Sequence, residues 1–218
     1  MKVVPIKSEE TYPWLLEKHY AKRIPQIVFA FGLYDYDILV GVCTYGYPPS
    51  KNLCYGICGQ EFTDHVLELN RLCLVDNAKN QASFLVANSI RLLPKPTIVV
   101  SYADIDKGHV GYVYQATNFI YTGLSAIRKD VKIRGMEHLH SRTLTHQITA
   151  SEMRQKYGDD VFTVDRPRKH RYVYFHGNKS QKKTMLKALK YPVEKYPKGD
   201  SRKYESGGVV PTQNLLFM

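Results

Sequence analysis

Polar side chains gather within residues 101–123, where the pattern changes from strand to helix. Residues 97–102 are apolar and β-branched, which predicts a strand buried on both faces, and Asp104 stands where it ends. Open α/β sheets bind ligands beyond the carboxyl ends of their strands, so Asp104 is a candidate acid–base group in a cleft. Asp104 and Asp106 are equally typical of helix N-caps, and that structural role is the alternative.

A helix is expected to begin at Asp104 and to end near Asn118, with Tyr114 on its inward face. Gly108 and Gly111 let its start approach a ligand or another backbone closely. A buried phenol can act as a general acid or orient a reacting oxygen, so Tyr114 and Asp104 are predicted to share one cleft.

A second group of polar residues lies within residues 65–75, a strand that is mainly apolar on both faces and therefore central. Glu68, Asn70 and Arg71 fall on this strand. Buried ionised groups are costly unless they are paired, so each of these must meet a partner, a ligand or water. Arg71 could stabilise developing negative charge, and a structural Glu–Arg pair is the alternative.

The tyrosine-rich segment resembles the Mom family of bacteriophage DNA-modification proteins, a divergent branch of the GNAT acyltransferase fold. The matching motifs are Tyr102-Ala-Asp104, Gly108-His-x-Gly111, Tyr114-Gln-Ala-Thr-Asn-Phe119, Tyr121-x-Gly123 and Glu68-Leu-Asn-Arg71, with His140-Ser-Arg142 a weaker one. The resemblance covers about residues 26–177. It implies transfer of a carbamoylmethyl group to adenine N6 in phage DNA, which protects that DNA from restriction, and it places Arg71, Ser83, Asp104 and Tyr114 on functional positions.

The resembled fold also implies a β-bulge in the strand of residues 65–75, which splays it from its neighbour to form a cofactor cleft. In that fold the following loop binds the pyrophosphate of acetyl-CoA at a helix N-terminus. The glycines usual in this loop are absent here, and Lys79, Asn80 and Ser83 offer side-chain donors instead. Acetyl-CoA or a related acyl donor is the expected cofactor, and the requirement for it is expected to be changed or reduced relative to other proteins of the resembled fold.

Duplex DNA is the expected partner. Residues 126–205 hold twenty basic and nine acidic side chains, whereas residues 26–125 hold six and eight. An adenine that is extruded from the duplex is stabilised by stacking on aromatic side chains in the site. The predicted DNA-binding residues are Tyr45, Tyr47, Tyr102, Tyr112, His109, Arg142, Arg166, Arg168, Lys169 and Arg171, with further phosphate contacts from the lysines of residues 179–190.

The order of elements predicts an α/β fold with a GNAT-like mixed, mostly antiparallel sheet flanked by helices and a basic C-terminal extension. A first helix is expected to begin at Ser8 or Thr11 and to end at Pro25. Further helices are expected over residues 80–93, over residues 151–157 and after Asn178, and a loop is expected to begin at Pro48. Strands are expected over 26–33, 38–45 and 171–175, and residues 124–134 are expected to pair with 137–145 about Gly135. Residues 1–199 are read as one domain and 200–218 as a loosely held tail.

Three function classes stay open on the sequence. Beside the DNA-modifying transferase, the chain could be an acetyltransferase for a small amine or a protein lysine, which predicts an acidic substrate channel, or a DNA-binding protein without chemistry. A metal on His138 and His140 with Asp104 or His109 is a weaker possibility. The four cysteines and the absence of a long apolar run or signal peptide favour the cytoplasm.

Overall fold

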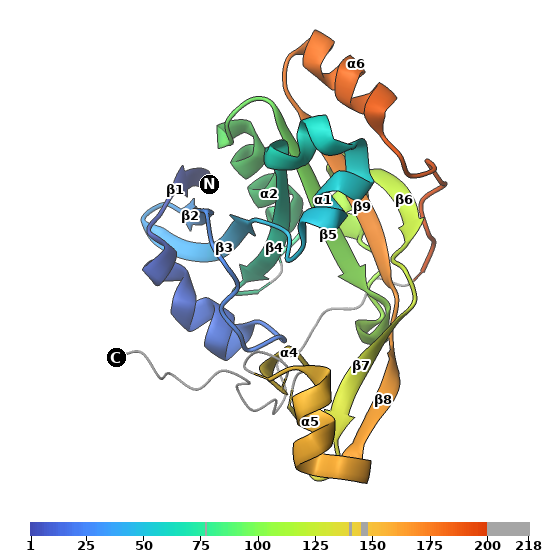
Figure 1. Cartoon of the computed structure of the whole chain (residues 1–218). Coiled ribbons are helices and arrows are strands. Elements are labelled where there is room, and N and C mark those ends of the chain that lie inside the picture. Colours follow the sequence, from blue (N-terminus) through green and yellow to red (C-terminus); the bar gives the residue numbers. More distant parts are fainter. Residues whose placement is uncertain (77, 140, 145–147, 200–218) are drawn as a thin grey trace.

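Seven short strands of mainly apolar residues build the central sheet, in the order β1-β2-β3-β4-β5-β9-β6 (Figure 1). The computed structural model describes residues 1–199 except 77, 140 and 145–147. The strands are β1 (Lys2–Pro5), β2 (Phe29–Asp35), β3 (Ile38–Gly46), β4 (Val66–Leu74), β5 (Thr97–Asp104), β6 (Ile120–Leu124) and β9 (Lys169–His176). Only β4 and β5 pair in parallel. The predicted mixed, mostly antiparallel sheet is confirmed.

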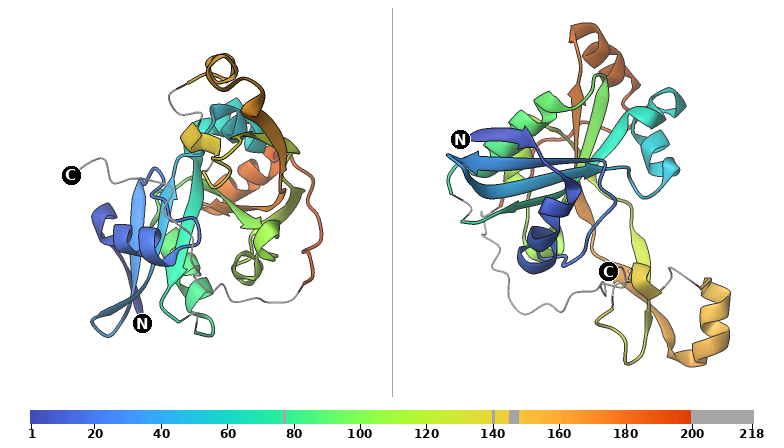
Figure 2. Two further views of the ribbon diagram at one scale, coloured as in Figure 1. Left: turned by 90° about the horizontal axis from the view of Figure 1, so that it is seen from below. Right: turned by 90° about the vertical axis from the view of Figure 1, so that its left-hand side faces the viewer.

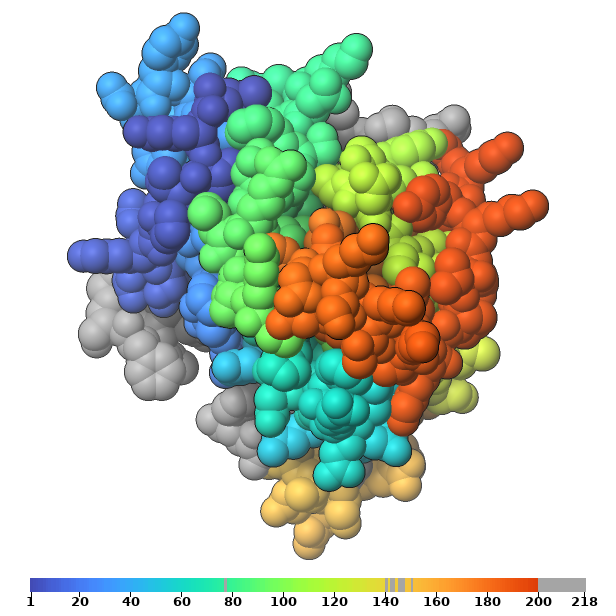
Figure 3. All heavy atoms as spheres, turned by 90° about the horizontal axis from the view of Figure 1, so that it is seen from above, coloured from blue at the N-terminus to red at the C-terminus, as the bar shows by residue number. Residues whose placement is uncertain are grey.

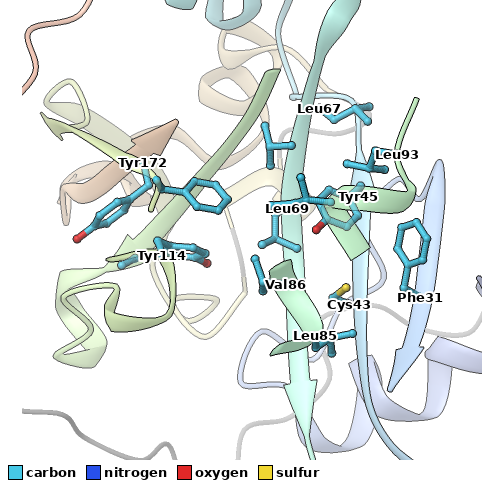
Figure 4. Packing of buried hydrophobic residues seen from close by; sticks show 14 of the residues in the cluster. Phe31, Cys43, Tyr45, Leu67, Leu69, Leu85, Val86, Leu93, Tyr114 and Tyr172 are labelled. Atoms are coloured by element: carbon cyan, nitrogen blue, oxygen red, sulfur yellow. The ribbon is translucent and has the colours of Figure 1, made fainter. Parts of the chain in front are cut away.

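Helices cover both faces of this sheet (Figure 2). α2 (Gln81–Leu92) and α3 (Tyr112–Ala116) pack on one face over a core that includes Tyr45 and Leu85 (Figure 4). α1 (Lys51–Cys58) and α6 (Lys179–Ala188) pack on the other face over Ile98 and Val173. α6 lies beside α1 on the surface that Figure 3 shows. No described helix is both long and apolar enough to cross a bilayer.

One extra residue in β4 bends the sheet where the cleft forms. Thr44 pairs with Arg71 while Tyr45 pairs with Leu69, so Asn70 is the bulged residue between them. The parallel ladder from β4 to β5 covers only the pairs that start at Val66 and end at Glu68. Beyond Glu68 the two strands diverge. The bulge and the splay that the resemblance implied are both confirmed.

A two-stranded ribbon projects from the body of the molecule (Figures 1 and 2). It consists of β7 (Arg128–Ile133) and β8 (Val161–Arg166), with α4 (Ser141–Leu144) and α5 (Ala150–Tyr157) at its far end. The predicted pairing of residues 124–134 with 137–145 about Gly135 is wrong. A capping box between Thr149 and Glu152 starts α5, and the chain returns to β7 only after that helix.

Two other expectations near the N-terminus are corrected. The helix predicted up to Pro25 is reduced to a 3₁₀ turn, Ser8–Thr11, and a short π-helix, Trp14–Lys18, after which His19 is extended. The loop expected from Pro48 contains α1, because the Ser50 hydroxyl caps the Leu53 N–H at 3.3 Å. The edge strand β1 was not predicted.

Candidate functional site

A cleft of about 1500 Å³ opens where β4 and β5 diverge. Its walls come from residues 18–26, from β4 after Leu67, from the start of α2, from residues 102–114 and from the base of the ribbon. Most of the predicted site residues line it: Tyr47, Arg71, Lys79, Asn80, Ser83, Tyr102, Asp104, His109, Tyr112, Tyr114, Arg166, Lys169 and Arg171. The fold therefore brings together side chains that stand far apart in the sequence.

Asp104 ends β5 and faces the cleft with only 13% of its side chain exposed. Its Oδ2 accepts a hydrogen bond from Lys169 Nζ at 2.8 Å, across the pair of strands β5 and β9. Its Oδ1 accepts from the Asp106 N–H at 3.2 Å, which caps the 3₁₀ turn Ile105–Lys107. The Asp104 carboxylate thus caps the turn and also lines the cleft. The α-helix that was expected to begin at Asp104 begins at Tyr112 instead.

Tyr114 projects from α3 into the apolar core at the cleft floor. Its ring packs against Phe119 and Tyr172, with ring centroids 5.4 and 5.2 Å away, and Figure 4 shows its hydroxyl directed toward the β4 side of the cluster. Burial raises the pKa of Tyr114 to about 12, and the nearby Ser101 hydroxyl opposes that shift. The phenol therefore keeps its proton near neutral pH and can act as a donor.

Gly111 makes this packing possible. Its φ is +80°, and a Cβ there would stand 2.5 Å from Cε2 of Tyr172. Any larger residue would push apart α3 and β9, and with them the side chain of Tyr114.

Arg71 is held at the cleft wall by backbone carbonyls. Its Nη1 donates to the Asn70 carbonyl at 2.6 Å, and its Nε and Nη2 donate to the Arg23 carbonyl at 3.3 Å. Burial lowers the pKa of Arg71, while the nearby Glu68 carboxylate raises it. These contacts fasten residues 23–26 to the bulge and place a fixed positive charge beside Glu68.

An aromatic wall from the N-terminal segment was not predicted. The ring of His19 stacks on that of Tyr20 at 4.5 Å, and His109 meets Tyr20 edge-on at 6.1 Å. All three line the cleft. The sequence signal is the adjacent pair His19-Tyr20 close to Lys18 and Lys22, and the helix expected up to Pro25 masks it because that helix would include both residues.

His19 is a neutral hydrogen-bonding group in this wall. Its Nδ1 accepts the Ala21 N–H at 3.0 Å, which places the ring proton on Nε2. Burial, and then the charge of Arg71, lower the pKa of His19 to about 3.

The start of α2 presents donors to the same cleft. Lys79 and Asn80 are exposed before the first helical residue, Gln81, and the Ser83 hydroxyl donates to the Asn80 carbonyl at 3.0 Å. A cation beside the positive end of a twelve-residue helix suits an anionic group.

Two predicted DNA-binding residues do not lie on the cleft wall. Tyr45 is fully buried and its hydroxyl bonds to Ser89 Oγ at 2.7 Å, so it cannot stack on a base. The guanidinium of Arg168 donates from Nε to the Ser125 carbonyl at 2.6 Å and serves the local backbone.

Two further predicted phosphate contacts are already occupied. Arg171 is 8% exposed, donates to Thr122 Oγ1 at 2.9 Å and lies over the ring of Tyr191. Arg166 pairs with Asp130. Both guanidinium groups are therefore engaged by contacts within the protein.

The lysines of α6 lie away from the cleft, whereas Lys190 directly precedes Tyr191, which lines it. β9 begins at Lys169, beside Asp104, and ends at His176, beside Thr97, which is about 23 Å further along the strand. α6 follows that far end of β9, so its lysines do not lie next to the part of the cleft that contains Asp104.

Cations dominate the described lining of the cleft, with eight basic side chains against four carboxylates. They are Lys18, Arg23, Arg71, Lys79, Arg128, Arg166, Lys169 and Arg171, against Glu68, Asp104, Asp106 and Asp130. Among the described residues no three His, Cys, Asp or Glu side chains are grouped as metal ligands. His138 lies in a turn, and His140 and the side chain of Arg142 fall outside the described part.

Comparisons with known proteins point to one family. The model of the Mom protein family matches residues 1–198. Methylcarbamoylase mom of Escherichia phage Mu is 30% identical over 190 residues, which cover 83% of this chain and 77% of that protein.

Solved structures show a distant likeness. The Bacillus subtilis acetyltransferase in complex with CoA has a TM-score of 0.44 and 15% identity, over 80% of this chain and 98% of that one. An N-acetyltransferase of Staphylococcus aureus Mu50 has a TM-score of 0.42 and 13% identity, over 80% and 97%.

Proposed function

Because this chain belongs to the Mom protein family, we propose that it is a transferase that adds a carbamoylmethyl-type group to N6 of adenine in double-stranded DNA and so protects phage DNA from restriction. The observation that carries the proposal is the convergence of Arg71, Ser83, Asp104 and Tyr114 on one cleft. These are the four positions that the resemblance to the family places on its functional motif.

The reaction forms a bond between N6 and the carbon of the transferred group, removes one proton from N6 and returns one to the departing group. The lone pair of N6 is delocalised into the ring, so N6 becomes acidic only as the new bond forms. A weak base is then sufficient, and Asp104 serves as that base beside Lys169. The phenol of Tyr114 is protonated before the reaction and donates that proton to the departing group. Arg71 stabilises the negative charge that develops as this group leaves.

The residues at the start of α2 fit an acyl donor that carries phosphates, such as acetyl-CoA. Lys79, Asn80 and Ser83 would hold its anionic part, in place of the glycines that do so in the resembled fold. Acetyl-CoA itself would supply only an acetyl group. A carbamoylmethyl group bears an amide nitrogen and is joined to N6 through its CH₂ carbon, so it would require a related donor that carries that nitrogen and a leaving group on that carbon.

The basic lining supports a polyanionic substrate. An acetyltransferase for protein lysines predicts an acidic channel, whereas cations outnumber carboxylates two to one here. The volume exceeds that of ordinary ligand pockets, which are about 300–1000 Å³, and leaves room for a donor and an extruded base together. Tyr20 and His109 offer the base an aromatic wall in place of Tyr45.

The test is mass analysis of nucleosides from plasmid DNA of cells that express the protein. We expect an adenine derivative heavier by a carbamoylmethyl group, and none with the double variant Asp104→Asn/Tyr114→Phe. Unmodified DNA from cells with well-expressed, folded wild-type protein would contradict the proposal.

A further inference from the structure

A short segment at the rim of the cleft, residues 125–129, connects the body to the ribbon. Its Ser125 N–H donates to the Lys169 carbonyl at 2.8 Å, and the Lys169 N–H donates to Ser125 Oγ at 2.9 Å. Lys169 in turn binds Asp104. The segment is therefore anchored, through one residue, to the carboxylate proposed as the base.

Ile127 is the exceptional residue of this segment. Its neighbours Ser125, Ala126 and Arg128 all line the cleft, yet 74% of Ile127 is exposed to solvent. Two residues span at most about 7 Å, so Ile127 stays close to the anchored Ser125. Exposure at the rim of the cleft leaves this aliphatic side chain available to a substrate that enters there.

Positive charge flanks Ile127 on its C-terminal side. Arg128 and Lys129 are both exposed and, as successive strand residues, point to opposite faces of the ribbon. Lys129 has only a loose ion pair, 4.0 Å, with the exposed Asp165. Two cations that follow the apolar tip and point to opposite faces of the strand suit the phosphates of a DNA backbone.

We propose that residues 125–129 are the edge on which duplex DNA docks, and that Ile127 enters the base stack where the target base leaves it. The inference rests on the proposed function, because only chemistry on a base requires extrusion. Extrusion costs unstacking energy, and an inserted apolar side chain fills the gap and holds the duplex open. Arg128 and Lys129 hold the flanking phosphates, and the base turns into the cleft toward Asp104.

The test uses full-length protein and a pool of duplexes with randomised sequence around a single 2-aminopurine, whose fluorescence rises when it is unstacked. The variants are Ile127→Ala, which removes the wedge, and Ile127→Leu, which keeps its bulk. Ile38→Ala is the matched control, because Ile38 is 69% exposed on β3 but lies about 26 Å along that strand from Gly46, the residue before the cleft-lining Tyr47.

We expect wild-type protein, Ile127→Leu and Ile38→Ala to raise the fluorescence. We expect Ile127→Ala to lose about tenfold or more of that rise, because the unstacking cost is no longer offset, while it binds the pool within about threefold of wild type. The inference would be overturned if Ile127→Ala raised the fluorescence as much as the wild-type protein does, or if the wild-type protein did not raise it at all. A rise with wild-type protein whose cells show unmodified adenine would instead contradict the proposed chemistry and leave the docking edge supported.

Discussion

Lys169 Nζ lies 2.8 Å from Asp104 Oδ2, and the two residues face each other across the antiparallel pair β5 and β9. The ammonium stabilises the charged carboxylate at the end of a strand, and the backbone of the same lysine holds Ser125 at the rim. One residue thus connects the proposed base to the segment on which DNA is proposed to dock.

Asp104→Asn separates the catalytic role of this side chain from its role as a cap. Asparagine caps as well as aspartate, so the free energy of unfolding should change by less than about 1 kcal/mol. The amide cannot accept a proton, so adenine modification should fall at least about a hundredfold. Nucleoside mass analysis and denaturant unfolding check the two effects, and a fully active Asp104→Asn would reduce Asp104 to a structural residue.

Tyr114→Phe should abolish proton donation while the packing against Tyr172 and Phe119 persists. We expect about a hundredfold to ten-thousandfold less modified adenine from the same amount of folded protein. Tyr121→Phe is the control, because Tyr121 is equally buried and its hydroxyl bonds to His170 on the β6–β9 pair, without lining the cleft. Equal losses in both variants would point to a general loss of stability.

Arg128 and Arg168 should differ in DNA binding although both are basic and near the ribbon base. Arg128→Ala should lower the slope of log affinity against log salt by about one, because one phosphate contact is lost. Arg168→Ala should leave the slope unchanged, since its guanidinium binds the Ser125 and Leu124 carbonyls. Fluorescence anisotropy over a range of salt concentrations measures both slopes; a reversed order would refute the assignment.

His19 should make the fold sensitive to acid. Its pKa is about 3 in the folded state and 6.5 for the ordinary side chain, so the unfolded chain binds the proton more readily. This stabilisation is complete above pH 6.5 and is lost as the pH falls toward 3. At about pH 5 the loss should be ~2 kcal/mol.

Urea unfolding of wild type and His19→Gln at about pH 7.5 and pH 5 isolates this contribution. Other histidines with lowered pKa, such as His109 and His176, act in the same direction in both proteins. The wild type should therefore lose more stability than the variant, and equal losses would contradict the prediction.

Lys79→Ala should weaken the binding of CoA by up to about fivefold, because it removes a cation beside the N-terminus of α2. Lys51→Ala is the control, since Lys51 is exposed at the start of α1 and does not line the cleft. Calorimetric titration with CoA gives both affinities. Unchanged affinity in Lys79→Ala would place the donor elsewhere.

The sequence predicts those parts of the fold in which hydrophobic pattern and local chemistry agree. The strand around Val99 is a continuous apolar run, the strand around Leu69 is mainly apolar on both faces, and the helix after Asn178 has its own capping box. β8 was missed because Thr163 and Asp165 give it an exposed, polar face. Its pairing with β7 depends on a return of the chain after α5, which no local signal encodes.

The site follows the same division. Asp104 and Tyr114 were predicted because a strand end and a helix face are local features. The segment that carries His19 and Tyr20 is held at the cleft by long-range contacts, such as the one between Arg71 and the carbonyl of Arg23, 48 positions apart. Tyr45 is buried in the core, which residue type alone does not show, and neither its contact with Ser89 nor that of Arg171 with Thr122 has a local sequence signal.

The short ladder between β4 and β5 has a mechanical consequence. Three residue pairs, together with the Ser101 hydroxyl on the Leu69 carbonyl, are what join the two halves of the sheet at this seam. Beyond Glu68 no β4–β5 ladder pair closes the gap between the two strands. The opening of the cleft is therefore built into the pairing of the sheet, and the Ser101 hydroxyl and the apolar cluster around Leu69 and Tyr114 hold its inner end together.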